Sequence, residues 1–87
     1  MAIDFPKVEA WNGNRDIVSF PADSDGKRIS CAISWEALQD NYGGANQEPL
    51  ACFKANRAAI EGKATGLILR KRFEADGSIL VRSGDGP

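Results

Sequence analysis

The chain has 87 residues, which is enough for one domain and excludes a second folded unit. Hydrophobic residues make up 43% of it and charged residues 26%, a composition that excludes an intrinsically disordered protein. A chain of this length buries only about 60–65% of the surface that its unfolded form exposes. One small core therefore provides nearly all the stability, and there is no room for a deep, enclosed substrate chamber.

The formal net charge of −1 gives no overall attraction to nucleic acid or to an anionic membrane. The charge is unevenly distributed, because residues 1–50 carry a net −4 and residues 54–82 a net +4. No apolar run approaches the roughly 20 residues of a membrane span, and the N-terminus lacks the basic-then-apolar order of a secretory signal. We therefore expect a cytoplasmic protein without a membrane partner.

Histidine is absent from the sequence, which removes the commonest general base and metal ligand and every Ser-His or Cys-His pair. The two cysteines, Cys31 and Cys52, are too few for a disulfide framework and lack the spacing of a zinc site. Cys31 falls on the apolar side of its predicted strand, where a thiol is usually inert packing. We predict a non-enzymatic protein with no catalytic residues, no metal site and no cofactor.

A β-hairpin is the clearest element in the first half of the chain. Residues 1–15 predict an extended arm followed by a turn. Strands are predicted over residues 16–22 and 27–33, joined by the short polar loop 23–26. Pro21 cannot donate a ladder hydrogen bond, which predicts that the first strand lies at an edge or ends there.

Two helices are predicted after the hairpin. Ser34 is a suitable N-cap for a short helix that begins at Trp35 and stops after about two turns, at Gly43-Gly44. A long helix is predicted from Pro49, because apolar residues then recur every three or four positions. We expect this helix to end at residue 70 or 71.

The end of the long helix has an alternative. Gly62 and Gly66 each weaken a helix by about 0.8–1 kcal/mol relative to alanine, so an earlier stop with residues 67–73 as a strand stays open. A last strand is predicted over residues 78–82, and the tail 83–87 is expected to be disordered.

These elements predict an α+β fold over a single domain, residues 1–82. A small, mostly antiparallel sheet, made of the β-hairpin and the C-terminal strand, would pack against one long helix and one short helix. This is the smallest architecture that buries both the strand alternation and the helix stripe.

In the order and spacing of several short segments, the chain resembles a family of small bacterial proteins known as domain of unknown function 1488. The residues that carry the resemblance are Ile3-Asp4-Phe5-Pro6, Trp11, residues 18–22, residues 26–34, Glu36-Ala37-Leu38, Phe53, Asn56-Arg57, Ile60, Ala64 and residues 76–79. None of them is a catalytic signature. The resemblance implies one compact α+β domain, and it implies no particular activity.

Arg57 is the charged residue that falls inside the apolar stripe of the predicted long helix, between Phe53 and Ile60. Its guanidinium could bind a small anion through two parallel hydrogen bonds, with Asn56 beside it as a second polar contact. The alternative, which we favour, is that Arg57 pairs with Glu61 one turn later, or with Glu36 or another acidic residue of the N-terminal half.

The segment 54–72 carries a net +5, which suggests weak nucleic-acid binding as a further alternative. Its cations scatter around the helix and no aromatic residues interleave with them, which favours a solvated helix surface. Our leading prediction is a protein-interaction or regulatory module that binds a protein partner through its charged helix or an open sheet edge. A homodimer, in which the basic helix meets the acidic half of a second copy, is part of this prediction.

Overall fold

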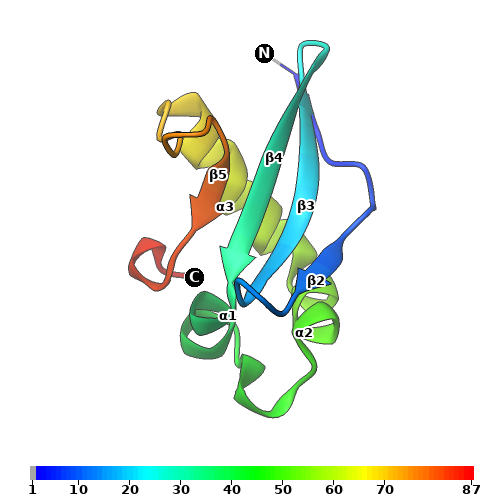
Figure 1. Ribbon diagram of the computed structural model, residues 1–87, viewed down its shortest axis with the longest axis vertical. Coiled ribbons are helices and arrows are strands. Elements are labelled where there is room, and N and C mark those ends of the chain that lie inside the picture. Colours follow the sequence, from blue (N-terminus) through cyan, green and yellow to red (C-terminus); the bar gives the residue numbers. More distant parts are fainter. Residues whose placement is uncertain (1) are drawn as a thin grey trace.

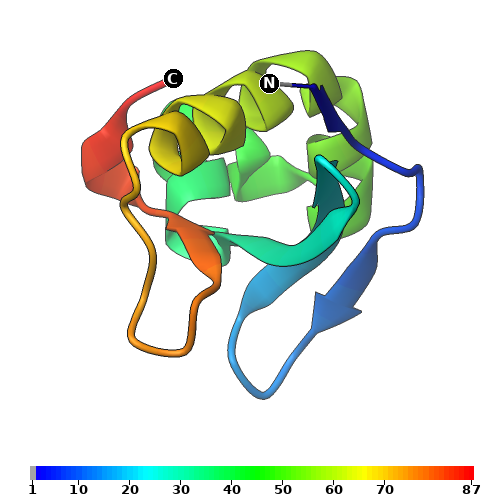
Figure 2. The ribbon, with the colours of Figure 1, turned by 90° about the horizontal axis from the view of Figure 1, so that it is seen from above.

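The computed structural model describes residues 2–87 as one sheet with helices packed on one face (Figure 1, Figure 2). The sheet order is β1-β3-β4-β5, and β2 also pairs with β3. The strands are β1 (Ile3–Asp4), β2 (Ala10–Asn12), β3 (Ile17–Ser24), β4 (Lys27–Ser34) and β5 (Ile79–Val81). The helices are α1 (Trp35–Asn41), α2 (Pro49–Ala55) and α3 (Arg57–Leu69), with 3-10 turns η1 (Gly44–Asn46) and η2 (Ser83–Asp85). The mostly antiparallel α+β class is confirmed.

The predicted hairpin is present and is longer than expected. β3 and β4 pair antiparallel over eight residues each, from Ile17 opposite Ser34 to Ser24 opposite Lys27. The connecting turn is only Asp25-Gly26, with φ angles of 51° and 84°. Two consecutive positive φ angles are those of a type I′ turn, whose twist matches that of paired strands.

Pro21 neither ends β3 nor marks it as an edge strand, contrary to the prediction. The other side of β3 is covered twice, because β2 pairs with it up to Ser19 and β1 pairs with it from Asp23 onward. Pro21 lies in the gap between these two short strands. Its missing N–H therefore costs no ladder hydrogen bond, which is how a proline fits inside a long strand.

The predicted long helix is wrong as a single element, because it is divided at Asn56 into α2 and α3. Asn56 has φ −121° and ψ 20°, outside the helical range, and its side-chain Nδ2 donates to the carbonyl of Cys52 at 2.9 Å. The side-chain amide shares that carbonyl with the backbone N–H of Asn56, which also donates to the carbonyl of Phe53 three residues back, so the backbone tightens locally at the break. Apolar spacing continues across Asn56, so periodicity gives no sign of it.

The alternative strand over residues 67–73 does not form. α3 continues to Leu69, and the chain then turns at Lys71, which has a φ of 57°. The N–H of Arg72 donates to the carbonyl of Leu67 at 2.9 Å, and this closes the helix end. The short helix α1 does form as expected, with the Ser34 hydroxyl accepting from the N–H of Ala37 at 3.0 Å.

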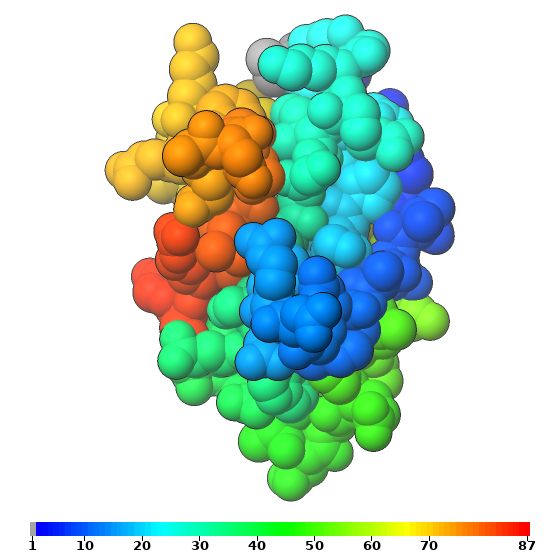
Figure 3. Space-filling view, in the orientation of Figure 1, coloured from blue at the N-terminus to red at the C-terminus, as the bar shows by residue number. Residues whose placement is uncertain are grey.

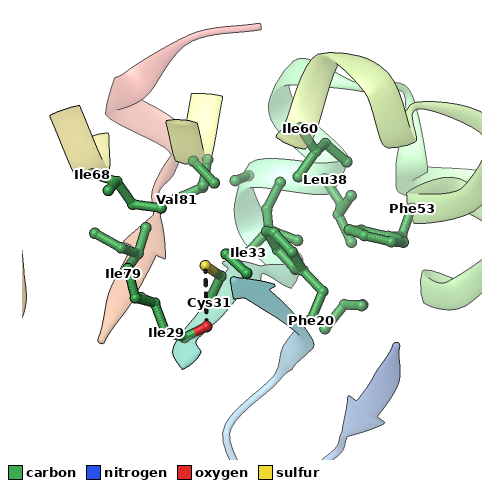
Figure 4. Packing of buried hydrophobic residues seen from close by; sticks show 14 of the residues in the cluster. Phe20, Ile29, Cys31, Ile33, Leu38, Phe53, Ile60, Ile68, Ile79 and Val81 are labelled. Carbon is green, nitrogen blue, oxygen red and sulfur yellow. Dashed lines mark hydrogen bonds between the residues drawn. The ribbon is translucent and has the colours of Figure 1, made fainter. Parts of the chain in front are cut away.

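One hydrophobic core lies between the helices and the inner face of the sheet (Figure 4). Phe53 of α2 is fully buried against Phe20 of β3, with ring centroids 5.1 Å apart. Cys31 also faces this core, and burial raises the pKa of its thiol to about 11. Its Sγ lies 3.8 Å from the carbonyl oxygen of Ile29, the contact drawn in Figure 4.

The segment 83–87, expected to be disordered, contains the ordered turn η2 against α1. The Asp85 carboxylate accepts from the N–H of Arg82 at 2.7 Å, and Asn41 of α1 donates to the carbonyl of Ser83 at 2.9 Å. Lys63 of α3 donates to the carbonyl of Asp85 at 2.8 Å. The contacts from Asn41 and Lys63 come from residues far away in the sequence, which a local composition argument does not include.

Candidate functional site

Arg57, the first predicted site residue, lies inside a cluster of charges at the start of α3. Its guanidinium is hydrogen-bonded to the carboxylate of Glu9, and its Nη1 lies 3.5 Å from Oε2 of Glu61. Lys54 adds a longer contact, 3.8 Å from its Nζ to Oε2 of Glu9. The guanidinium carbon sits 5.1 Å from the ring centroid of Phe53, within the range of a cation–π contact.

This cluster is internally balanced, because two carboxylates face the Arg57 guanidinium. The side chains of Arg57 and Glu9 are only 19% and 12% exposed. The hydrogen bond from Arg57 lowers the pKa of Glu9, and the nearby positive charges of Arg57 and Lys54 lower it further. The structure therefore brings Arg57 together with Glu61 and, in the N-terminal half, with Glu9 and not with Glu36, whose carboxylate accepts from the Ser83 hydroxyl. Anion binding by Arg57 stays a prediction.

Asn56, the second predicted site residue, has a local backbone role. Its amide donates to the Cys52 carbonyl at the α2–α3 junction and lies 3.9 Å from the Cys52 thiol. Asn56 and Arg57 are neighbours in sequence, yet their polar groups serve different contacts. Neither residue lines the outer-face hollows of the sheet that are described below.

The cations of segment 54–72 are distributed over separate contacts. Lys54 faces Glu9, Lys63 binds the Asp85 carbonyl, and Arg70 donates back to the carbonyl of Gly66 at 3.2 Å. Lys71 and Arg72 are exposed beyond the end of α3. This arrangement gives no continuous basic stripe, so nucleic-acid binding remains the weaker alternative.

The helices leave the opposite face of the sheet uncovered (Figure 2). Because core residues alternate along β3 and β4, the residues between them point to this outer face. Their side chains are mostly small, as in Ser19, Ser30 and Ala32. Figure 2 shows that no helix covers this face and that two loops project from its sides.

A hollow of about 610 Å³ occupies the outer face between those loops (Figure 3). Its floor includes Ser19, Ser30 and Leu80. Arg15 of the β2–β3 turn stands on one side and Asp76 of the loop before β5 stands on the other. We call this region the outer hollow.

The two sides of the outer hollow carry opposite charges. Hydrogen bonds from the hydroxyl and the N–H of Ser78 lower the pKa of Asp76, and the positive charge of Arg15 contributes a smaller lowering. Asp76 is therefore ionised at neutral pH and held in place by Ser78, with Oγ to Oδ1 at 2.6 Å. A surface of this kind can bind polar and charged groups of a partner.

Sequence reasoning missed Arg15, Asp76 and Ser78 as site residues. The sequence predicts that Asp76 is part of a turn, and no neighbouring residue in the sequence indicates that this turn faces the β2–β3 loop. The sequence signal that was available is the row of small outward-facing residues of the hairpin, such as Ser19, Ser30 and Ala32. No group of three or more side chains suited to hold a metal ion lies together within residues 2–87.

None of the helices within residues 2–87 is long and apolar enough to cross a membrane.

Comparison with known proteins finds similarity to an uncharacterized protein, YrdB, in Escherichia coli (strain K12). The two are 38% identical over 77 residues, which cover 87% of this chain and 91% of that protein. The Shigella flexneri protein of the same name matches to the same extent.

A crystal structure from Shewanella loihica, of a protein of unknown function from the DUF1488 family, has a similar fold. The TM-score is 0.81 at 27% identity, covering 91% of this chain and 90% of that one. The family described as "Protein of unknown function (DUF1488)" matches residues 3–81, as the sequence resemblance implied. The chain therefore belongs to the DUF1488 family.

Proposed function

We propose that this domain is a non-enzymatic, cytoplasmic protein-interaction module that binds its partner through the outer face of the sheet. The observation that carries the proposal is the outer hollow, which has a floor of small side chains between Arg15 and Asp76. Opposite charges on its two sides favour one orientation of a partner with a complementary pattern.

Two chemical observations support binding over catalysis. The sequence has no histidine, and the Cys31 thiol is protonated at neutral pH because burial raises its pKa to about 11. The second candidate, an anion site at Arg57, is disfavoured because the carboxylates of Glu9 and Glu61 already pair with the guanidinium and would repel an anion.

Site-specific photo-crosslinking in living bacteria tests the proposal. A benzoylphenylalanine replaces Ala75, which lines the outer hollow, or Ala59, which is exposed on α3 and serves as the control. We expect one defined protein adduct from position 75 and none from position 59. Arg15→Glu should remove that adduct without changing the melting temperature. Adducts from position 59 alone, or none from position 75, would reject the proposal.

A further inference from the structure

The β4 strand is longer than its partner on one side. β4 has eight residues, whereas β5 has three and pairs with it only from Cys31 to Ile33. The first four residues of β4, Lys27–Ser30, therefore extend past the start of β5 (Figure 1). We call this stretch the free edge of β4.

The hairpin register shows which backbone groups face the free edge. A two-residue turn makes Ser24 and Lys27 a hydrogen-bonded pair, and such pairs then alternate along the ladder. Ile29 and Cys31 accordingly direct their backbone groups to β3, whereas Arg28 and Ser30 direct theirs to the other side. Since Ser30 has no pairing partner in β5, the N–H of Ser30 and both backbone groups of Arg28 have no backbone partner among residues 2–87.

The loop before β5 does not pair with the free edge of β4, because backbone N–H groups of the loop donate to acceptors within the loop itself. The N–H of Glu74 donates to the Ser78 carbonyl at 2.7 Å, and the N–H of Gly77 donates to the Glu74 carbonyl at 2.9 Å. The N–H of Ser78 binds the Asp76 carboxylate at 3.0 Å. The loop is thus folded on itself and stands apart from β4.

A second hollow, of about 490 Å³, lies between the free edge and this loop. Lys27 to Ser30 form one side, and Phe73 and Asp76 to Ser78 form the other. Phe73 is 42% exposed. The hollow shares Ser30, Asp76 and Ser78 with the outer hollow, so the two are continuous.

The charge beside the free edge is positive. Lys27 makes no ion pair with any residue from 2 to 87, whereas its neighbour Arg28 is paired with Asp23. Asp76, across the hollow, accepts hydrogen bonds from Ser78 and makes no ion pair with any described residue either. The hollow is therefore positive on the β4 side and negative on the loop side, and a carboxylate placed beside β4 would be attracted to Lys27.

We propose that the free edge of β4 binds an extended segment of a partner protein as an added strand, in the position that β5 would occupy if it were longer. The segment would donate to and accept from the backbones of Arg28 and Ser30, which is the chemistry of strand addition. An apolar side chain of the segment would contact Phe73, and an acidic one would face Lys27. This inference rests on the proposed function and names the chemistry of the partner.

Two blocked pentapeptides serve as probes, acetyl-EVTVE-amide and its basic counterpart acetyl-KVTVK-amide. In an NMR titration of the 15N-labelled protein we expect the acidic peptide to shift the amide signals of Arg28 and Ser30 most. The basic peptide should bind about fivefold more weakly, because it meets Lys27 with like charge. No shift at these amides with the acidic peptide, or equal affinities for the two peptides, would overturn the proposal.

A matched pair of variants tests the backbone contact. Ser30→Pro removes the N–H that faces the hollow and no hydrogen bond to β3, whereas Ser30→Ala keeps that N–H. We expect Ser30→Pro to abolish binding and Ser30→Ala to retain it. Should Ser30→Pro fail to fold, the peptide can be changed instead. N-methylation of its valine amides removes the N–H groups that would donate to β4 and should weaken binding at least tenfold. Unchanged binding after that change would reject strand addition.

The two proposals fail separately. If Ser30→Pro folds and the adduct from position 75 persists, the outer face binds a partner by another mode and strand addition is rejected. If the acidic peptide binds at Ser30 while position 75 gives no adduct, the free edge is a peptide site and the outer hollow is not.

Discussion

The two faces of the sheet differ in what their residues do. On the inner face Val18, Phe20 and Ile33 alternate into the core and are covered by three helices. On the outer face Ser19, Ser30 and Ala32 form the floor of an uncovered hollow. The same two strands thus build the stability of the domain on one side and leave the other side available for binding. Substitutions on the two faces should separate stability from binding.

The largest expected effect is in the core that covers the inner face, at Phe53 of α2. Phe53→Ala leaves a cavity in a fully buried position against Phe20 and should lower the free energy of unfolding by about 3–5 kcal/mol. The control is Phe73→Ala, at the edge of the second hollow, which should cost less than about 1 kcal/mol. Urea denaturation monitored by tryptophan fluorescence measures both, and equal losses would remove the distinction between the faces.

The Glu9–Arg57 pair ties the N-terminal segment to the helices, and Glu9→Gln should destabilise the domain by about 1–2 kcal/mol at pH 7. The folded-state pKa of Glu9 is lowered from 4.5, so its contribution is complete above pH 4.5 and is lost as the pH falls through the lowered value. The variant should therefore have a flatter loss of stability in acid than the parent.

Asp23→Asn is the control, because it breaks the exposed Asp23–Arg28 pair of the outer face. Its effect should be much smaller than that of Glu9→Gln and should decrease with added salt. Melting curves from pH 7 to pH 3 test both variants. A parallel acid response in Glu9→Gln and the parent would show that Glu9 is not the group that titrates.

Two glycines on the helical side give opposite predictions. A Cβ at Gly44 would lie 2.9 Å from the backbone oxygen of Leu38 and 3.2 Å from the Cys52 thiol, so Gly44→Ala should cost about 1–3 kcal/mol. Gly62 in α3 has nothing within 4 Å, and Gly62→Ala should stabilise by about 0.5–1 kcal/mol. Thermal melting of both variants checks the signs, and a gain in Gly44→Ala would contradict the packing at η1.

The smallest effect on stability is expected from Arg15→Glu on the outer face. Arg15 is exposed and makes no ion pair within residues 2–87, so the free energy of unfolding should change by less than about 0.5 kcal/mol. Loss of the crosslinked adduct at constant stability would sharpen the separation between the two faces. A large loss of stability would show that the outer face also holds the fold together.

Local patterns predicted the elements that local forces determine. The alternation of Ile29, Cys31 and Ile33 predicted a strand, and Ser34 predicted a helix start, because each depends on residues a few positions away. The break at Asn56 was missed because the backbone tightens there, with the Asn56 N–H shared between the carbonyls of Cys52 and Phe53, without interrupting the apolar spacing. Burial patterns also carry no strand direction, so the parallel pairing of β5 could not be predicted.

The candidate site was less predictable than the fold. Arg57 was singled out because a charge inside an apolar stripe needs a partner, and that reasoning anticipated an acidic partner without identifying Glu9, 48 positions away. The outer hollow depends on two loops, around Arg15 and Asp76, that approach each other only in the folded molecule. The proximity of two exposed loops in the folded chain produces no periodic pattern in the sequence.

The parallel pairing of β4 with β5 has a consequence for folding. Parallel neighbours require a crossover, and here the connection contains all three helices. Ile79 and Val81 are fully buried, so Ile33 and Ile68 stay uncovered until that long loop has closed. Docking of β5 should thus be a late, slow step, and chains shortened before residue 79 should aggregate through their exposed interior.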